Sequence, residues 1–432
     1  MKIVSESTFC LYPISRGNNW GFGGKTPFKD NCIVLDLSML NRVSEYEESF
    51  GTIRITPGVS QGDLSEYLKN KNSKFYLDVT GSGTETSVLG NTLERGIAYN
   101  SLRVDSLQSL EVLLPNGVVI NTGFSGYLNC DVKNLYQHGI GPELKGLFLQ
   151  SNLGIVLSAT IKLKKRQEKV VSFRISIAET KVGSLIEVIS SLLSDGVIDC
   201  IAHIGDPLRI RSTKEPILQN SKDFSDNDLK LVLKKLQLID SESPIWSCLG
   251  NIQGPKGLVR AKQKIIKKRM SHIGKVQFYD EDTICLVTTY LNWGPFKNTI
   301  KFLRATESLR GLINGNATSE AVKMLFWSPK KKNIVPYKDN GDIDVDKSPS
   351  GCIFCVPLTT MNKKGADKLI NHFRSFSSKH GLLMGATLNT LNANVLEAVI
   401  SFHFDPSTEE IQNIHKLFIE FNQELIRDGL FP

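Results

Sequence analysis

Apolar and polar positions alternate along this chain in a way that predicts both strands and amphipathic helices. Short apolar or alternating runs predict strands, which cover residues 9–14, 32–37, 52–59 and 154–164, and a β-hairpin over residues 111–120. Apolar residues at helical spacing predict helices, which cover residues 63–71, 366–380 and 408–428. A chain that mixes both patterns in this way is typical of an α+β fold.

A glycine-rich loop separates the first two predicted strands, between Ser15 and Gly24. Glycines at positive φ turn backbone N–H groups inward, and three polar side chains add donors. Such a nest suits a diphosphate. Gly24-Lys25-Thr26 imitates the end of a P-loop, but Pro27 and a strand follow it, so no helix is available to hold phosphate.

A second polar loop covers residues 79–96 and is rich in glycine, serine and threonine. It is too polar for a core segment and too long for a simple turn, so we expect a functional loop. Downstream, Asn116-Gly117 lies between two apolar runs and predicts a β-hairpin. Nowhere does a G-x-G-x-x-G sequence join a strand to a helix, so a Rossmann site is not expected.

Composition narrows the class of protein. The 432 residues are 41% hydrophobic, which is enough for two globular domains. The net charge of +8 is spread over amphipathic segments, a pattern more typical of solvated faces than of a nucleic-acid site. The eight cysteines lack the spacing of a zinc site, so we expect no metal, buried free thiols and a reducing compartment. Because neither a signal peptide nor a membrane-spanning run is evident, the expected location is cytoplasmic.

Five motifs occur in one order along the first 156 residues. They are residues 15–24, the Pro57-Gly58-Val59 turn, residues 90–96, residues 114–117 with Thr122-Gly123, and residues 141–156. Together they resemble the flavin-binding (PCMH-type) domain of the vanillyl-alcohol oxidase and 4-cresol methylhydroxylase family. The resemblance implies a two-subdomain FAD-binding domain at 1–168, followed by an α+β substrate, or cap, domain at 169–432.

The resemblance also implies FAD as cofactor, with its diphosphate on the first loop, its ring beside residues 90–96 and its adenine end near residue 154. The implied contacts are Ser15, Arg16, Gly17, Asn18, Asn19, Gly21, Phe22, Gly23, Gly81, Ser82, Gly90, Asn91, Arg95, Gly96, Gly154, Ile155 and Val156. Cys352 falls where relatives with covalent flavin carry the linking residue. A non-covalent flavin is expected, because a cysteine in an apolar strand is usually inert, and an 8α-S-cysteinyl link is the alternative.

The implied activity is that of an FAD-dependent oxidoreductase. It would oxidise a small organic alcohol, amine or aromatic compound by hydride transfer to the flavin N5, with O2 or an unidentified acceptor as the oxidant. Glu94 falls where the family places an aspartate near the reactive edge, so it is the candidate general base or charge stabiliser. The alternative for Glu94 is a structural ion pair with Arg95 or Arg103. The alternative for the whole chain is a degenerate, non-catalytic flavin-binding or interaction protein.

The chain departs from the family pattern at several points. Phe22 replaces a tyrosine that binds phenolate in relatives, and Ser328 replaces an arginine after Trp327. The final Tyr-Arg segment of relatives is also missing, which makes a para-alkylphenol substrate doubtful. The first strand-helix unit is missing too, and an uncovered sheet edge favours a homodimer. His203 is a further candidate for lining a substrate pocket, and a structural role is the alternative.

Overall fold

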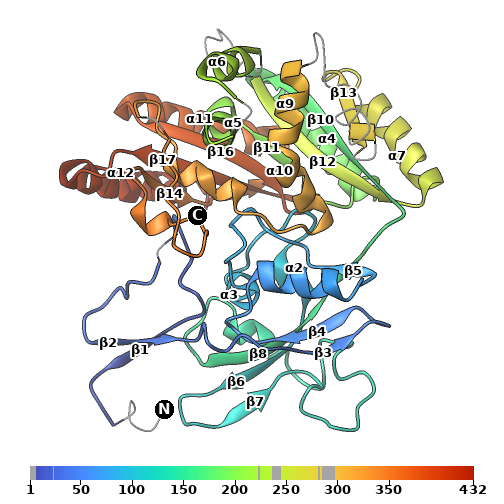
Figure 1. The fold of residues 1–432 in the computed structure, drawn as a ribbon, viewed down its shortest axis with the longest axis vertical. Coiled ribbons are helices and arrows are strands. Elements are labelled where there is room, and N and C mark those ends of the chain that lie inside the picture. The colour runs from blue at the N-terminus through green and yellow to red at the C-terminus, as the bar shows by residue number, and fades with distance from the viewer. Residues whose placement is uncertain are drawn as a thin grey trace. The chain divides into compact units, whose positions relative to one another are not determined.

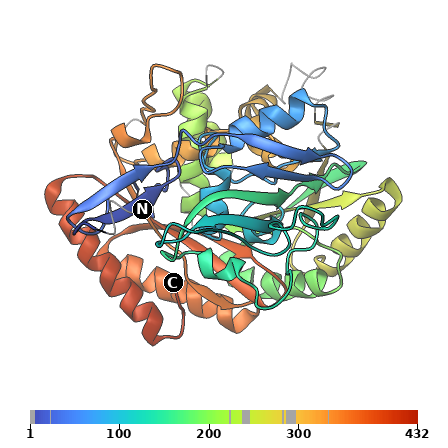
Figure 2. The same ribbon diagram turned by 90° about the horizontal axis from the view of Figure 1, so that it is seen from below.

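The computed structural model describes residues 6–22, 24–221, 224–235, 245–280, 283–284, 297–331 and 333–432. The chain forms two compact units (Figures 1 and 2). Unit 1 takes the chain up to Arg166 together with Arg310–Ser319, and unit 2 takes Gln167–Leu309 together with Glu320–Pro432. The functional domains expected at 1–168 and 169–432 stay a prediction. No pattern in the sequence indicates that Arg310–Ser319 belongs to unit 1.

The described residues of unit 1 form three small sheets. The largest has five strands in the order β3-β4-β8-β6-β7, which are Val43–Glu47, Thr52–Ile55, Ile155–Lys162, Leu107–Leu113 and Val119–Asn121. β1 (Cys10–Ile14) pairs with β2 (Cys32–Asp36) in parallel, and β5 (Phe75–Tyr76) pairs with β9 (Lys164–Lys165). β6 and β7 form the predicted hairpin, with Gly117 at φ 85°. The pleat buries Ile53 and Ile55 of β4 completely, as alternation along the strand requires.

Two helices of unit 1 carry clear sequence signals at their N-termini. α2 (Gln61–Asn70) begins after a capping box in which Ser60 and Asp63 each bond the other's backbone N–H. α3 (Val88–Leu93) begins after Ser87, whose hydroxyl accepts from the N–H of Gly90. α3 corrects the expectation of an irregular loop over 79–96. Its six residues include a glycine and an asparagine, which hide its helical pattern.

The segment Arg310–Ser319 returns to unit 1 through backbone carbonyls. Asn100 Nδ2 donates to the carbonyl of Ile313 at 3.2 Å, and Ser65 Oγ donates to that of Gly315, also at 3.2 Å. Gly315 has φ 81°, and an added Cβ would lie 2.4 Å from the Tyr76 ring. Only glycine fits this position, because the backbone is left-handed and the ring closes the space.

In the described ranges of unit 2 the strands form one large sheet with the path β13-β10-β12-β11-β16-β17-β14, and β15 also pairs with β17. In that order the strands are Val276–Asp280, Lys169–Ala178, Ile245–Gly254, His203–Gly205, Leu383–Thr390, Val395–Phe404 and Gly351–Cys355, with β15 at Leu358–Thr360. Every pairing in this sheet is antiparallel. Strands distant in sequence therefore become neighbours, as β11 and β16 do.

One face of this sheet carries the main apolar core of unit 2. Helices α4 (Val182–Ser194), α7 (Lys256–Arg269), α11 (Lys363–His380) and α12 (Thr408–Arg427) contribute buried residues to it. α11 and α12 lie side by side (Figure 2), and their Phe376 and Phe421 rings are 4.9 Å apart. Phe173 of β10 fills the space above Gly250 of β12, where an added Cβ would lie 2.4 Å from the ring.

The opposite face of the sheet is polar and is approached by α5 (Pro207–Gln219). Arg209 of α5 donates through Nε to Thr387 Oγ1 of β16 at 3.2 Å. The remaining described α-helices of unit 2 are α6 (Asp226–Lys235), α9 (Lys297–Ala305) and α10 (Glu307–Gly311), which continues into the unit 1 segment of the chain. The described 3₁₀ helices of unit 2 are η3 (Glu179–Lys181), η6 (Glu320–Phe326) and η7 (Val345–Lys347). The mixture of helices and mostly antiparallel sheets confirms the α+β prediction.

The cysteines and the helix lengths test two further expectations, which are buried free thiols and the lack of a membrane-spanning segment. The described cysteines are all free, and Cys200, Cys248 and Cys355 are buried. Cys10 is exposed, so the expectation of buried thiols was wrong there, because β1 leaves its first residue open to solvent. Cys285 lies outside the described residues. In the part of the chain that the structure describes, every helix is too short or too polar to cross a membrane.

Candidate functional site

The loop between β1 and β2 has the backbone conformation that its glycines predict. Gly17, Gly21 and Gly24 have φ values of 65°, 82° and 136°, which side-chain-bearing residues rarely adopt. The N–H of Phe22 donates to the carbonyl of Asn19 at 3.1 Å and closes a tight turn. The predicted contact Gly23 lies outside the described residues.

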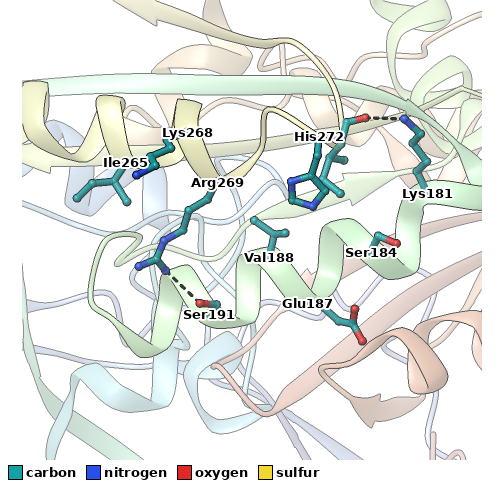
Figure 3. A pocket seen from close by; sticks show the side chains of 10 residues that line it. Lys181, Ser184, Glu187, Val188, Ser191, Ile265, Lys268, Arg269 and His272 are labelled. Atoms are coloured by element: carbon teal, nitrogen blue, oxygen red, sulfur yellow. Dashed lines mark hydrogen bonds between the residues drawn. The ribbon is translucent and has the colours of Figure 1, made fainter.

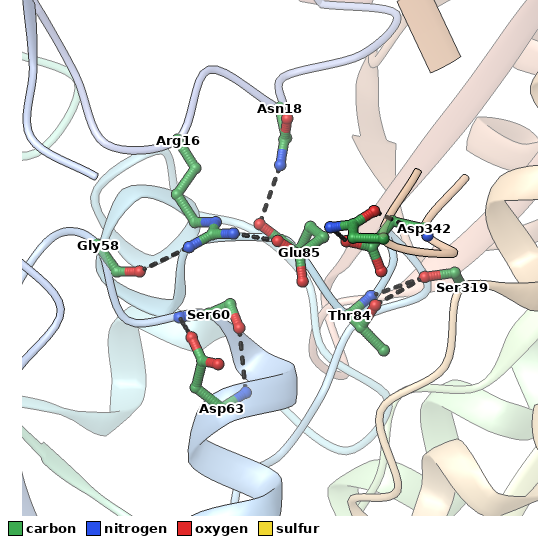
Figure 4. Close-up of polar contacts among 10 residues, drawn as sticks. Arg16, Asn18, Gly58, Ser60, Asp63, Thr84, Glu85, Ser319 and Asp342 are labelled. Carbon is green, nitrogen blue, oxygen red and sulfur yellow. Dashed lines mark hydrogen bonds and ion pairs between the residues drawn. The ribbon is translucent and has the colours of Figure 1, made fainter. Parts of the chain in front are cut away.

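Arg16 and Asn18 tie this loop to two other turns of unit 1 (Figure 4). Arg16 Nη1 donates to the carbonyl of Gly58 at 3.1 Å, and Nη2 forms an ion pair with Glu85. Asn18 Nδ2 donates to the carbonyl of Glu85 at 2.9 Å. The sequence did not single out Glu85, because an acidic residue in a threonine-rich loop has no periodic or motif signal.

The Pro57-Gly58 turn leaves no room for a side chain. A Cβ added to Gly58 would lie 2.0 Å from the carbonyl oxygen of Ser38 and 2.8 Å from that of Leu40. The Gly58 N–H also donates to the Leu40 carbonyl at 2.7 Å. This close approach fixes the turn that receives Arg16.

Gln61, the first residue of α2, forms hydrogen bonds that fix the polar loop before α3. Its fully buried side chain donates to the carbonyls of Thr80 and Gly83, and it accepts from the Thr80 N–H at 3.1 Å. The predicted contacts Gly81 and Ser82 lie between these anchors. Sequence reasoning missed Gln61, because a glutamine at the start of an amphipathic helix usually faces solvent.

α3 meets the glycine-rich loop at Gly90. A Cβ added there would lie 2.4 Å from Ser15 Oγ, so the two predicted contacts, Ser15 and Gly90, are neighbours. Loop 15–24, the Gly58 turn and loop 79–96 therefore meet within unit 1. This convergence is the geometry that a single extended ligand needs, and the roles of the individual residues stay a prediction.

Glu94 and Arg95 follow α3 and are both exposed. Among the described residues Glu94 makes no ion pair with Arg95 or Arg103, so the structural alternative for Glu94 has no support here. Arg95 has φ 54°, a left-handed conformation that costs a non-glycine residue roughly 1 kcal/mol. The following Gly96 N–H donates to the carbonyl of Asn91 at 2.8 Å and stabilises this bend.

Two buried guanidinium N–H groups provide a test of whether these loops fit FAD. Arg103 donates to the carbonyl of Asp78 at 2.9 Å and to Asn91 Oδ1 at 3.2 Å, but its buried Nη2 has no partner among the described residues. Arg16 Nε is also buried and unpartnered there. Burial lowers the pKa of Arg103 to about 10, so it stays charged at neutral pH. Unpaired cationic donors beside glycine-lined turns fit an anionic, flat ligand such as FAD.

Residues 154–156, which are predicted to contact the adenine end of FAD, lie at the start of β8 in the five-stranded sheet. A Cβ added to Gly154 would lie 2.6 Å from Val112 Cγ1, so this glycine allows the chain to approach β6 closely. Ile155 and Val156 are buried at the start of β8. Their side chains pack into the core, so a contact with the cofactor would come from the backbone of residues 154–156.

In unit 2, Cys352 stands on β14 opposite His403 of β17. Burial raises the pKa of the Cys352 thiol to about 12, while the nearby Arg209 charge lowers it in part. A neutral thiol is a poor nucleophile, which is consistent with the expected non-covalent flavin. The absence of a covalent link stays a prediction.

The polar face of the unit 2 sheet carries a row of three side chains on neighbouring strands. His203 Nδ1 donates to Asn389 Oδ1 at 2.8 Å, and Asn389 Nδ2 donates to Glu397 Oε2 at 3.0 Å. The three residues are direct cross-strand partners on β11, β16 and β17. Burial raises the pKa of Glu397 to about 7. Sequence reasoning found His203 and missed the other two, because their relation depends on strand pairing.

Trp327 is surrounded by charged groups, although Ser328 replaces the family's arginine. Trp327 Nε1 donates to Glu215 Oε2 at 2.9 Å, and Arg211 Nε donates to the same oxygen at 2.7 Å. The Arg211 guanidinium lies 5.7 Å from the Trp327 ring centroid. An arginine thus reaches this tryptophan from α5 rather than from the next position in the chain.

A hollow of about 840 Å³ lies between α4 and α7 of unit 2 (Figure 3). Lys181, Lys268, Arg269 and His272 line it together with apolar side chains, and Arg269 donates to Ser191 Oγ at 3.0 Å. None of the predicted site residues lines this hollow. The described ranges also contain no group of histidine, cysteine, aspartate and glutamate residues arranged to hold a metal ion.

Comparison with known proteins gives concordant matches. Residues 1–123 match the model of a family described as FAD binding domain. The 1'-carboxy-chondrochloren decarboxylase of Chondromyces crocatus is 38% identical over 415 residues, which cover 94% of this chain and 75% of that protein. The 4-cresol dehydrogenase [hydroxylating] flavoprotein subunit of Pseudomonas putida is 29% identical over 157 residues, or 36% of this chain and 30% of that protein.

A solved structure agrees with the fold. The 4-ethylphenol oxidase from Gulosibacter chungangensis superposes with a TM-score of 0.81 over 99% of this chain and 77% of that chain, at 20% identity. At that identity the match supports the fold alone. By contrast, the match to 1'-carboxy-chondrochloren decarboxylase covers 94% of this chain at 38% identity, which establishes common family membership.

Proposed function

Because the chain belongs to the vanillyl-alcohol oxidase and 4-cresol methylhydroxylase family of FAD-dependent oxidoreductases, we propose that its substrate carries a carboxylate that is lost as CO2 during oxidation. The observation that carries this proposal is the 38% identity to a decarboxylase over 94% of the chain. Unit 1 binds FAD in this proposal, and unit 2 selects the substrate.

The proposed reaction balances as an oxidative decarboxylation. The carbon adjacent to the one bearing the carboxylate loses a hydride, the C–COO⁻ bond breaks, and its electron pair becomes the π bond of the product. FAD, when bound, supplies the two-electron acceptor for this loss at N5. O2 or another acceptor would be the final oxidant. An alcohol, amine or aromatic group elsewhere in the substrate is compatible with this scheme.

The FAD-binding role is assigned to the loops that meet in unit 1. Arg103 supplies positive charge and an N–H donor, and Arg16, which is paired with Glu85, supplies a further donor, because each has a buried N–H group that lacks a partner among the described residues. The backbone of loop 15–24 supplies further donors. The remaining proposed contacts are Ser15, Gly17, Asn18, Asn19, Gly21, Phe22, Gly81, Ser82, Gly90, Asn91, Arg95, Gly96, Gly154, Ile155 and Val156.

Glu94 is the proposed general base or charge stabiliser. It caps the end of α3, the helix whose Gly90 approaches Ser15, and it is free of an ion pair among the described residues. An unpaired carboxylate can accept a proton from a substrate hydroxyl or ammonium group, or stabilise positive charge that develops when a hydride leaves.

A phenolate substrate has less support. Phe22 is 52% exposed and has no hydroxyl, and the N–H of Ser328 is bonded to Asn333 Oδ1 at 2.7 Å. These positions provide none of the charge-assisted hydrogen bonds by which a phenolate is held, each of which is worth about 1.5–3 kcal/mol. A carboxylated substrate does not depend on them.

The direct test uses 1'-carboxy-chondrochloren, the compound in the relative's name, labelled with ¹³C in its carboxylate. Mixed without oxygen with the FAD-loaded protein, it should bleach the flavin band near ~450 nm and release one equivalent of ¹³CO2. Its methyl ester, which cannot lose CO2, is the matched control and should leave the band intact. Bleaching without CO2, or bleaching by the ester as well, would contradict loss of the carboxylate.

Flavin attachment has a separate test. Precipitation of the loaded protein with acid should release all the flavin into the supernatant, because the Cys352 thiol stays protonated. A yellow pellet from the natural protein and a colourless one from Cys352→Ser would establish the S-cysteinyl link instead.

A further inference from the structure

His403 lies on the polar face of the unit 2 sheet. In β17 the alternate residues Leu396, Ala398, Ile400 and Phe402 face the apolar core, so His403 faces the other way. There it is only 5% exposed. Its neighbour across the strand pair is Cys352, which shares this face.

Both ring nitrogens of His403 are buried and lack a hydrogen-bond partner among the described residues. Burial and the neighbouring Arg209 charge lower the pKa of His403 to about 3, so the ring is neutral at physiological pH. A neutral imidazole has one N–H donor and one acceptor. Native proteins rarely leave such groups unsatisfied in the interior, so an unfilled donor here points to a bound molecule.

The groups around His403 show what kind of molecule fits. Trp327 lies edge-on to the ring, with the centroids 5.0 Å apart, and its indole N–H is already bonded to Glu215. Glu215 is paired with Arg211 as well, so its charge is neutralised. Arg209 adds a positive charge near His403 and Cys352, and its guanidinium lies 5.4 Å from the Phe354 ring centroid.

We propose that His403 and Arg209 form a carboxylate subsite in unit 2, in which the imidazole N–H donates to a substrate carboxylate and the guanidinium supplies the opposite charge. This proposal rests on the function proposed above and names the part of the chain that recognises the leaving carboxylate. Trp327 and Phe354 provide the flat, apolar walls beside that carboxylate.

The charge of the subsite also suits the reaction. Two cations would stabilise the carboxylate strongly in the ground state and oppose the loss of its negative charge as CO2 forms. One cation and one neutral N–H donor orient the carboxylate with less of this opposing stabilisation. A neutral His403 is therefore better suited to this reaction than a charged one.

The test measures binding rather than turnover. The probes are 3-phenylpropanoate and its amide, 3-phenylpropanamide, which have the same shape and differ in charge, and the protein is the full FAD-loaded chain in a calorimeter. We expect the carboxylate to bind at least about tenfold more tightly than the amide, as a charge-assisted hydrogen bond predicts. His403→Phe and Arg209→Gln should each abolish most of that preference. His415→Phe, on the exposed side of α12, is the control and should keep it.

Two further measurements cover a variant that fails to fold. His403→Gln keeps a neutral donor and acceptor and should retain part of the preference. In the unaltered protein, labelled with ¹⁵N at histidine, the carboxylate should shift the resonances that disappear in His403→Gln, and the amide should not. Those resonances staying fixed would overturn the subsite whatever the stability of His403→Phe.

Several outcomes contradict the subsite. They are equal affinity for the two probes, an unchanged preference in folded His403→Phe, and no carboxylate binding up to about 10 mM. In the last case a buried water is the occupant of the His403 site. The proposed function fails separately: a carboxylate preference without ¹³CO2 release would remove the decarboxylation and leave the subsite standing.

Discussion

Units 1 and 2 build their polar regions in opposite ways. In unit 1, loops far apart in sequence are joined by bonds from side chains to backbone carbonyls, as Arg16 bonds Gly58, and by glycines that permit close approach, as Gly90 does beside Ser15. In unit 2, polar side chains stand on regular strands and meet through pairing, as Asn389 and Glu397 do. Backbone donors suit a phosphate-bearing cofactor, whereas side chains on a sheet are suited to selecting a substrate.

The two regions also differ in how burial acts on charge. On the sheet face, burial raises the pKa of Glu397 to about 7 and lowers that of His403 to about 3, so both groups lean toward neutrality. In unit 1, buried Arg103 keeps its charge, because its pKa falls only to about 10. A cofactor that brings its own negative charge needs the second kind of site.

The largest expected effect is on the free energy of unfolding, and it comes from a glycine of unit 1 at which two backbone segments approach closely. Gly58→Ala places a Cβ 2.0 Å from the Ser38 carbonyl oxygen, so a backbone segment must move. We expect the free energy of unfolding to fall by about 3 kcal/mol, measured by urea titration. Gly146→Ala, where an added Cβ meets nothing within 4 Å, is the control and should change it by less than about 0.5 kcal/mol. Equal stability of the two variants would show that the turn does not depend on close packing.

The next effect concerns rate. Glu94→Gln removes the proposed base and should slow flavin reduction by about a hundredfold, while FAD stays bound. Stopped-flow absorbance measures the rate, and the flavin spectrum measures occupancy. Unchanged reduction kinetics would remove Glu94 from the mechanism and leave the chemistry to unit 2.

A smaller effect is expected on cofactor affinity. Arg16→Ala removes one charge-assisted contact and should weaken FAD binding by about tenfold, measured by fluorescence titration. Glu85→Gln removes the competing carboxylate that pairs with Arg16 and should leave the affinity equal or higher. If Glu85→Gln weakens FAD binding as much as Arg16→Ala does, the ion pair is structural and the assignment of Arg16 to the diphosphate is wrong.

The smallest expected effect is on the pH dependence of stability, and it tests Glu397 on the polar face of the unit 2 sheet. The raised pKa of Glu397 means that, between about pH 4.5 and 7, the folded state holds a proton that the unfolded state has lost. Glu397 therefore lowers stability progressively as pH rises through this window. Glu397→Gln removes the loss, so the variant should gain roughly 1–2 kcal/mol relative to the natural protein between pH 5 and 8. Parallel stability curves for the two proteins would mean that Glu397 is solvated.

The sequence predicted the fold and the backbone conformation of several turns well, for identifiable physical reasons. Glycines at 17 and 21 and the Asn116-Gly117 turn have backbone requirements that few other residues meet, so their positions can be read directly. The strands and long helices likewise follow from periodicity. The family resemblance, now supported along 94% of the chain, then identified the cofactor.

Other features depended on contacts that a sequence does not display. α3 was hidden by glycine and asparagine within six residues, although Ser87 is a recognisable cap. Gln61 donates to the backbone carbonyl of Thr80 in a distant turn. Glu85 accepts from Asn18 through its own carbonyl and pairs with Arg16 through its carboxylate. The relation of Asn389 to His203 exists only once β11 and β16 pair, which local patterns cannot predict. The sheet face was therefore missed, apart from His203 and Cys352.

The most direct test of the central claim is a titration of the cofactor-free protein with FAD, followed by calorimetry and by the absorbance bands near ~370 and ~450 nm. Three variants each alter a different part of the convergence: Arg16→Ala in loop 15–24, Gly90→Val in α3, and Arg103→Gln beside Asn91. We predict one FAD per chain and weaker binding in all three variants, with Gly146→Ala unchanged. Stoichiometric binding that none of the three weakens would show that the meeting loops of unit 1 do not hold the cofactor.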